Sequence, residues 1–137
     1  MIRKTKDINF NKTKRKLDSF KRVAPKLVAE NTKSHFLKGF DKGGGQTDKS
    51  ASGWRGRKNP QKRGSRALLV DTGNLRASIK VLSSSFRKTV IGVKSLVYAK
   101  FINEGTPNMP QREFIGKSKK LERSNKRIIN RELKKIK

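Results

Sequence analysis

Positive charge is distributed unevenly along this chain, and that distribution limits where a core can form. Lysine and arginine number 37 against 10 acidic residues, which gives a net charge of +27. Residues 67–116 carry seven basic and three acidic side chains, whereas the much shorter segment 117–137 carries ten and two. Charged side chains are rarely buried without a partner. The middle of the chain is therefore predicted to form the core, with the basic residues on the segments around it.

The amino-terminal part has the spacing of helices. Residues 1–9 are polar and are predicted to form an arm outside a single domain that spans 10–137. From Phe10 to Phe40, apolar residues recur every three or four positions, which indicates helical structure. Pro25 lies inside this pattern and lacks an N–H, so it predicts a kink or the start of a second helix. Glycines at 39 and 43–45 are expected to end the helical region.

The predicted fold class is α+β. Residues 78–82 and 89–93 contain β-branched residues separated by serines and basic residues, which predicts a hairpin. Residues 67–70 are a candidate short strand, and 97–103 a candidate short helix or strand-to-helix turn ended by Gly105. A basic helix at 117–137 carries an apolar stripe, expected to pack on the sheet or on a neighbouring subunit. The predicted fold is a small antiparallel sheet that packs against two sets of helices, an amino-terminal kinked helix pair and the carboxyl-terminal basic helix. A long basic loop or hairpin completes it.

Residues 41–66 form the long basic loop, with Trp54 as its single large apolar residue. Unpatterned loops of this length in a small domain are usually functional or unstructured. The cations of the loop could contact nucleic-acid phosphates or dock on an acidic protein ring, and the sequence leaves both possibilities open. These cations are Arg55, Arg57, Lys58, Lys62, Arg63 and Arg66. Glycines 43–45 lack the Gly-Lys-Ser/Thr ending of a phosphate-binding loop and are interpreted as a linker.

Several kinds of site are disfavoured by the residues present. The chain has no cysteine, so it has neither a disulfide framework nor a thiolate metal site. His35 is the only histidine and is expected to be a partly exposed helix residue without a metal role. No recognisable Ser, His and Asp set and no patterned pair of carboxylates occurs. We therefore expect no enzymatic activity and no cofactor. No apolar run approaches a membrane span and no signal-peptide core is present, so an intracellular protein without membrane association is expected.

The segment Ala67-Leu68-Leu69-Val70-Asp71-Thr72-Gly73 resembles the active-site loop of retroviral-type aspartic proteases. In those enzymes two aspartates share a proton, so a single motif would need a second copy of the chain. The competing interpretation is a turn in which Asp71 or Thr72 caps a short helix. The segment Val90-Ile91-Gly92 matches only part of what should follow the protease motif. The capped turn is preferred, and the protease is kept as a remote alternative.

Four short motifs follow one another in the central region: Asp-Thr-Gly-x-Leu-Arg at 71–76, Tyr-Ala at 98–99, Gly-Thr at 105–106 and Arg-x-Phe at 112–114. Their order resembles the tail-completion (virion morphogenesis) proteins of tailed bacteriophages, the family that contains the phage Mu neck protein. The resemblance covers most of the chain and implies structural roles for Asp71, Thr72, Gly73, Leu75, Arg76, Tyr98, Ala99, Gly105, Thr106, Arg112 and Phe114. It also implies that Leu75 and Phe114 are buried, that Arg112 holds a carbonyl or carboxylate, and that Trp54 is a core anchor.

The same resemblance implies a structural bacteriophage virion protein of the neck, which completes the tail or joins it to the head as a homo-oligomeric ring. The family suggests a hexamer. The expected partners are further copies of the chain, the head connector or adaptor, and tail-tube or terminator proteins, with genomic DNA close by. The expected location is the virion, and the host cytoplasm during assembly. The main alternative to a neck protein is a basic nucleic-acid-binding protein, because a net charge of +27 favours binding to a polyanion.

Overall fold

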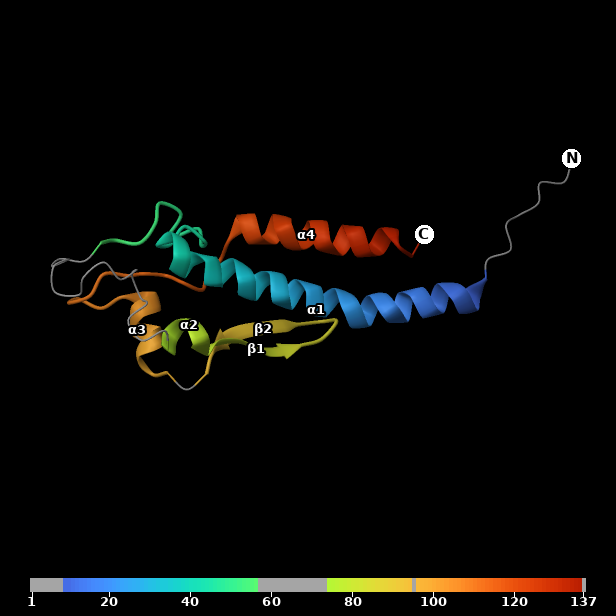
Figure 1. The fold of residues 1–137 in the computed structure, drawn as a ribbon, viewed down its shortest axis with the longest axis horizontal. Coiled ribbons are helices and arrows are strands. Elements are labelled where there is room, and N and C mark those ends of the chain that lie inside the picture. The colour runs from blue at the N-terminus through green and yellow to red at the C-terminus, as the bar shows by residue number, and fades with distance from the viewer. Residues whose placement is uncertain (1–8, 57–73, 95, 137) are drawn as a thin grey trace, which may run out of the picture.

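The computed structural model describes residues 9–56, 74–94 and 96–136, and it confirms the α+β class (Figure 1). Its elements are α1 (Phe10–Lys42), α2 (Asn74–Ser78), β1 (Ile79–Ser84), β2 (Thr89–Val93), α3 (Tyr98–Glu104) and α4 (Lys119–Lys134). In Figure 1, α1 runs along the long axis, between α4 and the hairpin, and the short helices lie near its carboxyl end. The candidate strand at 67–70 and residues 1–8 of the arm lie outside the described residues.

The first helix is continuous where a kinked pair was expected. α1 begins after Asn9, whose side-chain oxygen accepts a hydrogen bond from the backbone N–H of Lys12 at 3.1 Å. It then runs for 33 residues through Pro25. Proline removes a helical hydrogen bond, but Ala24 and Ala29 on either side of it are buried, and α1 packs against α4 and the hairpin. This packing supports the helix across the proline, and Figure 1 shows a bowed ribbon without a break.

The expected linker at 43–45 is a compact turn. Gly43 ends α1 with φ +73°, and Gly44 and Gly45 continue with φ +104° and +82°. The N–H of Gly44 donates to the carbonyl of Gly39 at 2.8 Å, and Gly39 itself lies within α1. The N–H of Trp54 donates to the carbonyl of Gly43 at 2.7 Å. Glycine is the residue that adopts three successive positive φ values without a steric penalty, so the turn depends on this run.

The hairpin has the predicted antiparallel pairing. Its register runs from Ile79 opposite Val93 to Ser84 opposite Thr89, with an irregularity between Val81 and Ser83. A two-stranded hairpin is marginal in water, and here it packs on α1 along both strands. At its tip, the ring of Phe86 meets Phe20 of α1 edge-on, with 6.2 Å between ring centroids. Within the described residues each strand pairs only with the other, so each has one unpaired edge.

The core lies around the carboxyl end of α1. Its buried side chains come from α1, the following loop, α2, β1, α3 and the segment before α4, and they are Phe40, Trp54, Leu75, Ile79, Ala99 and Phe114. Burial of each large apolar side chain contributes about 2 kcal/mol. The core therefore includes the predicted central region, and Phe40 and Trp54 extend it beyond that region.

The carboxyl-terminal helix packs along α1 through a mixed polar and apolar seam. The side-chain amide of Asn31 on α1 donates to Ser124 Oγ at 3.1 Å and to Asn125 Oδ1 at 2.8 Å on α4. Two apolar residues of the predicted stripe, Ile129 and Leu133, line a groove of about 430 Å³ together with α1 and the hairpin tip. The stripe is thus directed mainly at α1, and only its end reaches the hairpin.

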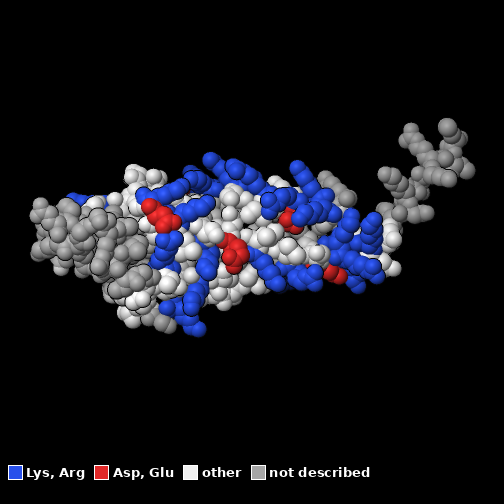
Figure 2. Space-filling view, in the orientation of Figure 1, with Lys and Arg blue, Asp and Glu red and all other residues white. Residues whose placement is uncertain are grey.

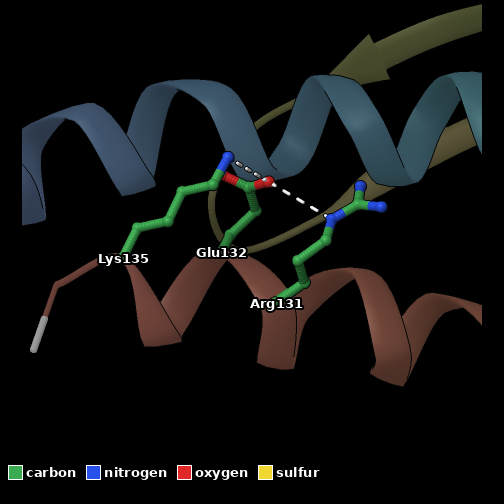
Figure 3. A network of polar contacts seen from close by, with 3 residues as sticks. All are labelled: Arg131, Glu132 and Lys135. Carbon is green, nitrogen blue, oxygen red and sulfur yellow. Dashed lines mark hydrogen bonds and ion pairs between the residues drawn. The ribbon is translucent and has the colours of Figure 1, made fainter.

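One acidic side chain is buried at this seam. Glu132 of α4 points towards α1 in Figure 3 and is almost fully buried. Lys135 Nζ donates to its two carboxylate oxygens at 3.1 and 3.2 Å, and Arg131 Nε lies 3.7 Å from Oε1. The carboxylate of Glu132 is therefore neutralised by Arg131 near the carboxyl end of α4 and by Lys135 just after it, on the side of the helix that faces α1.

Candidate functional site

The described motif segments meet beside the carboxyl end of α1, and Trp54 joins one of them to the loop after α1. The indole N–H of Trp54 donates to the backbone carbonyl of Glu113 at 3.0 Å. Its ring packs edge-on against Phe40, with 5.5 Å between centroids. Trp54, expected as a core anchor, is buried, and its hydrogen bond holds the loop after α1 against the Arg-x-Phe motif.

Arg112 makes a second link between the same two segments. Its Nε donates to the carbonyl of Arg55 at 2.9 Å, and its Nη2 donates to the carbonyl of Gly56 at 3.3 Å. Its backbone N–H donates to the carbonyl of Ile102 at 3.0 Å. The guanidinium thus has carbonyl partners of the kind expected for it, and its donors point in fixed directions because the group is planar.

Asn103 is the most connected polar side chain of this region, and sequence reasoning did not identify it. Its Oδ1 accepts from the backbone N–H groups of Phe114 and Ile115 at 2.9 and 3.1 Å, and its Nδ2 donates to the carbonyl of Ile115 at 3.0 Å. An asparagine near the end of a short helix resembles many other polar helix residues. Only the approach of residues 114–115 to α3 gives it this role.

The remaining motif positions are divided between the core, the surface and undescribed residues. Asp71, Thr72 and Gly73 lie outside the described residues, so neither the capped turn nor the protease loop is described. Leu75, Ala99 and Phe114 are in the core. Arg76 pairs with Asp41 of α1, with 2.7 Å between Nη1 and Oδ1.

Gly105 and Thr106 shape the turn after α3. Gly105 ends α3 with φ +79°, and a Cβ there would lie 3.0 Å from the backbone of Gln111. Thr106 pairs with Met109 in a single β-bridge. Both positions therefore act through the backbone, which returns the chain towards Arg112.

Most of the cations singled out in the basic loop lie outside the described residues. Of the six cations singled out, only Arg55 lies within the described residues, where it is exposed. Arg57, Lys58, Lys62, Arg63 and Arg66 lie outside them. A depression of about 550 Å³ is lined by Arg55, Gly56 and the turn from Glu104 to Arg112. Its described lining holds a single carboxylate, that of Glu104, and no described group of histidine and acidic residues could hold a metal ion.

His35 was expected to be partly exposed and is buried instead. Its Nε2–H donates to the carbonyl of Gln46 at 2.6 Å, and Ser118 Oγ lies 3.2 Å from the same nitrogen. The turn after α1 folds back over the helix and covers this side chain, which a helical pattern alone does not reveal. Burial lowers the pKa of His35 from its usual 6.5, the Gln46 hydrogen bond opposes this, and nearby Lys120, Lys38 and Lys42 lower it further.

The lowered pKa predicts an acid-sensitive fold. Protonation is easier in the unfolded chain, so the free energy of unfolding is expected to be highest above pH 6.5 and to fall as the pH drops through the lowered pKa of the folded state. Urea unfolding between pH 7 and pH 5 measures this. Because the chain has one histidine, His35→Gln should remove the slope in this range. An unchanged slope in that variant would assign it to other groups.

An apolar surface lies on α3 and immediately before it. Val97, Tyr98 and Phe101 are 84%, 45% and 50% exposed. Tyr98, one of the motif positions, is thus at the surface next to the buried Ala99. Two large apolar side chains of this seven-residue helix and the one immediately before it are exposed, so together they form a face suited to a protein contact.

The rest of the visible surface is strongly cationic. Figure 2 shows lysine and arginine side chains over α1 and α4, with few acidic residues among them. Three described acidic side chains are buried or paired: Glu132 between the helices, Glu113 before α4, and Asp41 with Arg76. No described helix is long and apolar enough to cross a membrane.

Comparisons with known proteins return no relative. No family model, no curated protein and no solved structure matches this chain.

Proposed function

We propose that this protein is a structural component of a bacteriophage neck, where it completes the tail or joins the tail to the head as a homo-oligomeric ring. The motif order described above is the basis of the proposal. The observation that carries it is the exposed apolar surface of Val97, Tyr98 and Phe101. Contact with a second copy of the chain would cover these side chains.

Two further features favour assembly over a solitary protein. The hairpin leaves one edge of each strand unpaired within the described residues, and unpaired edges can pair with another chain. The core is modest and concentrated at one end of α1, so contacts between copies would add apolar burial. The proposed partners beyond the ring are the head connector or adaptor and the tail-tube or terminator proteins.

The proposal assigns no reaction to the protein. Within the described residues, the depression beside Arg112 is lined by one carboxylate, that of Glu104, and by two arginines, without histidine or a second acid. The described motif positions, including Arg112, Leu75 and Phe114, hold segments of the fold together or fill its core. We therefore propose a role in positioning other proteins.

Phe101→Glu is expected to weaken self-association at least about tenfold, because it places a charge in the proposed apolar contact. Native mass spectrometry would show a shift towards the 15.6 kDa monomer. Leu17→Glu is the matched control, since Leu17 is a 40% exposed apolar residue of α1 far along the chain from α3. It should leave the oligomer intact.

The same variant tests the role in the particle. In the phage that encodes the protein, Phe101→Glu should yield separate heads and tails in electron micrographs, and Leu17→Glu should yield joined particles. Complete, infectious particles after deletion of the gene would refute the neck assignment. Joined particles from Phe101→Glu alone would refute only the α3 contact.

A further inference from the structure

The two sides of α4 differ sharply in chemistry. At about 100° per residue, Leu121, Asn125, Ile128 and Glu132 fall on one side, and this is the side that packs on α1. The opposite side is exposed and almost entirely cationic. Its charged members are Lys119, Lys120, Arg123, Lys126, Arg127 and Lys134, and the uncharged Asn130 lies among them. We call these seven residues the outer row of α4.

Little in the described structure neutralises this outer row. Of the two acidic residues in α4, Glu132 is buried against α1 and Glu122 lies towards the side of the helix. Arg123, Arg127 and Lys134 make no ion pair with any described residue. The upper edge of the molecule in Figure 2, where α4 lies, accordingly shows closely spaced cations. Like charges this close repel one another, and an anionic ligand would remove that cost.

The composition of the outer row favours nucleic acid over an acidic protein. Protein interfaces are depleted in lysine and rely on apolar or aromatic anchors at their centre. The outer row has no such anchor, and the uncharged residue among its members is Asn130. Interfaces with DNA are polar and strongly positive. Protein contact is better suited to the apolar surface of α3.

The spacing along the helix also fits a phosphate backbone. A helix of 16 residues is about 24 Å long. Arg123 and Arg127 are one turn apart, about 6 Å along the axis, and Lys134 lies about 10 Å further on. Duplex DNA carries about one charge per 1.7 Å of its axis. A helix laid along a groove edge can therefore place several cations near phosphates at once.

We propose that the outer row of α4 binds the phosphate backbone of duplex DNA without sequence preference. The contact is electrostatic, with counterion release as its main driving force. It does not depend on the neck assignment, since it follows from the charges of α4 alone. A DNA contact could persist in a protein with another function, and a neck ring could exist without it.

The test compares two variants with equal loss of charge in the full chain. The first is Arg123→Gln, Arg127→Gln and Lys134→Gln, at the centre of the outer row. The matched control is Lys80→Gln, Lys94→Gln and Lys100→Gln, at exposed positions of the hairpin, the segment after it and α3. Fluorescence anisotropy with a labelled duplex of mixed sequence, repeated over a range of salt concentrations, measures affinity and its salt dependence.

The α4 variant is expected to flatten the slope of log affinity against log salt by about 2 to 3 units, and the control by less than about 1. Equal effects of the two variants would overturn the proposal, because binding would then follow net charge alone. Displacement of the duplex by polyglutamate at equal charge concentration would also overturn the proposal, since the outer row would then bind any polyanion equally well.

A measurement on the unaltered protein does not depend on whether a variant folds. DNA is expected to protect Lys120, Lys126 and Lys134 from acetylation at least about threefold more than Lys80, Lys94 and Lys100. Mass spectrometry of the digested protein quantifies each lysine. Equal protection in both groups would contradict the assignment of the contact to α4.

Discussion

Replacing Gly44 by alanine is expected to destabilise the protein by about 3 kcal/mol or more, the sum of a backbone and a packing penalty. Gly44 has φ +104°, where a Cβ is strained. That Cβ would also lie 2.6 Å from the backbone nitrogen of Trp54 and 2.9 Å from its ring. Relief would require Trp54 to move, and the indole is held by its hydrogen bond to Glu113. Urea unfolding followed by the fluorescence of the single tryptophan measures the loss.

Gly43→Ala separates the two penalties. Gly43 has a similar positive φ of +73°, but nothing lies within 4 Å of its hypothetical Cβ. The Gly43→Ala variant should therefore be destabilised only by the backbone penalty, about 1–2 kcal/mol. Equal losses at the two positions would show that close contact with Trp54 is unimportant, and that the turn depends on backbone conformation alone.

Asn103→Ala is expected to cost about 2–4 kcal/mol, because it leaves two backbone N–H groups and one carbonyl without their partner. The affected groups are the amides of Phe114 and Ile115 and the carbonyl of Ile115. Phe114 is part of the core, so the loss should spread to the segment that leads into α4. Hydrogen exchange should show faster exchange at residues 114 and 115.

Asn103→Asp tests the geometry of this contact. A carboxylate keeps the two acceptor interactions but has no N–H to donate to Ile115, so its cost should be about half that of alanine. Asn130→Ala is the control, because Asn130 is an exposed asparagine on α4, and it should change stability by less than about 0.5 kcal/mol. A loss from Asn103→Ala as small as that of the control would contradict the role assigned to the side chain.

The predictions that succeeded concern features determined by neighbouring residues. β-branched residues on both sides of a polar turn predicted the hairpin, and its strands pair as expected. Gly105 was predicted to end the short helix, and it is the residue that does so. These outcomes follow from conformational preferences of a few adjacent residues, which tertiary contacts here do not oppose.

The corrections concern features that depend on distant segments. Pro25 predicted a kink or the start of a second helix, but α1 runs through it as one helix, with Ala24 and Ala29 buried. Glycines 43–45 were interpreted as a linker, but they form a turn that packs on Trp54. His35 was expected at the surface, and the same turn covers it. In each case the local preference was weaker than packing that brings together residues separated along the chain.

The sequence alone determined the kinds of elements, their approximate bounds and the concentration of positive charge towards the chain's ends, because these depend on composition and short-range spacing. Only the tertiary structure decided which polar side chains hold the site together and which cations share an exposed face. Asn103 gains its role when residues 114–115 reach α3. The outer row of α4 is defined by the side of that helix that α1 covers. Burial and pairing are properties of contacts between segments, so spacing within one segment does not encode them.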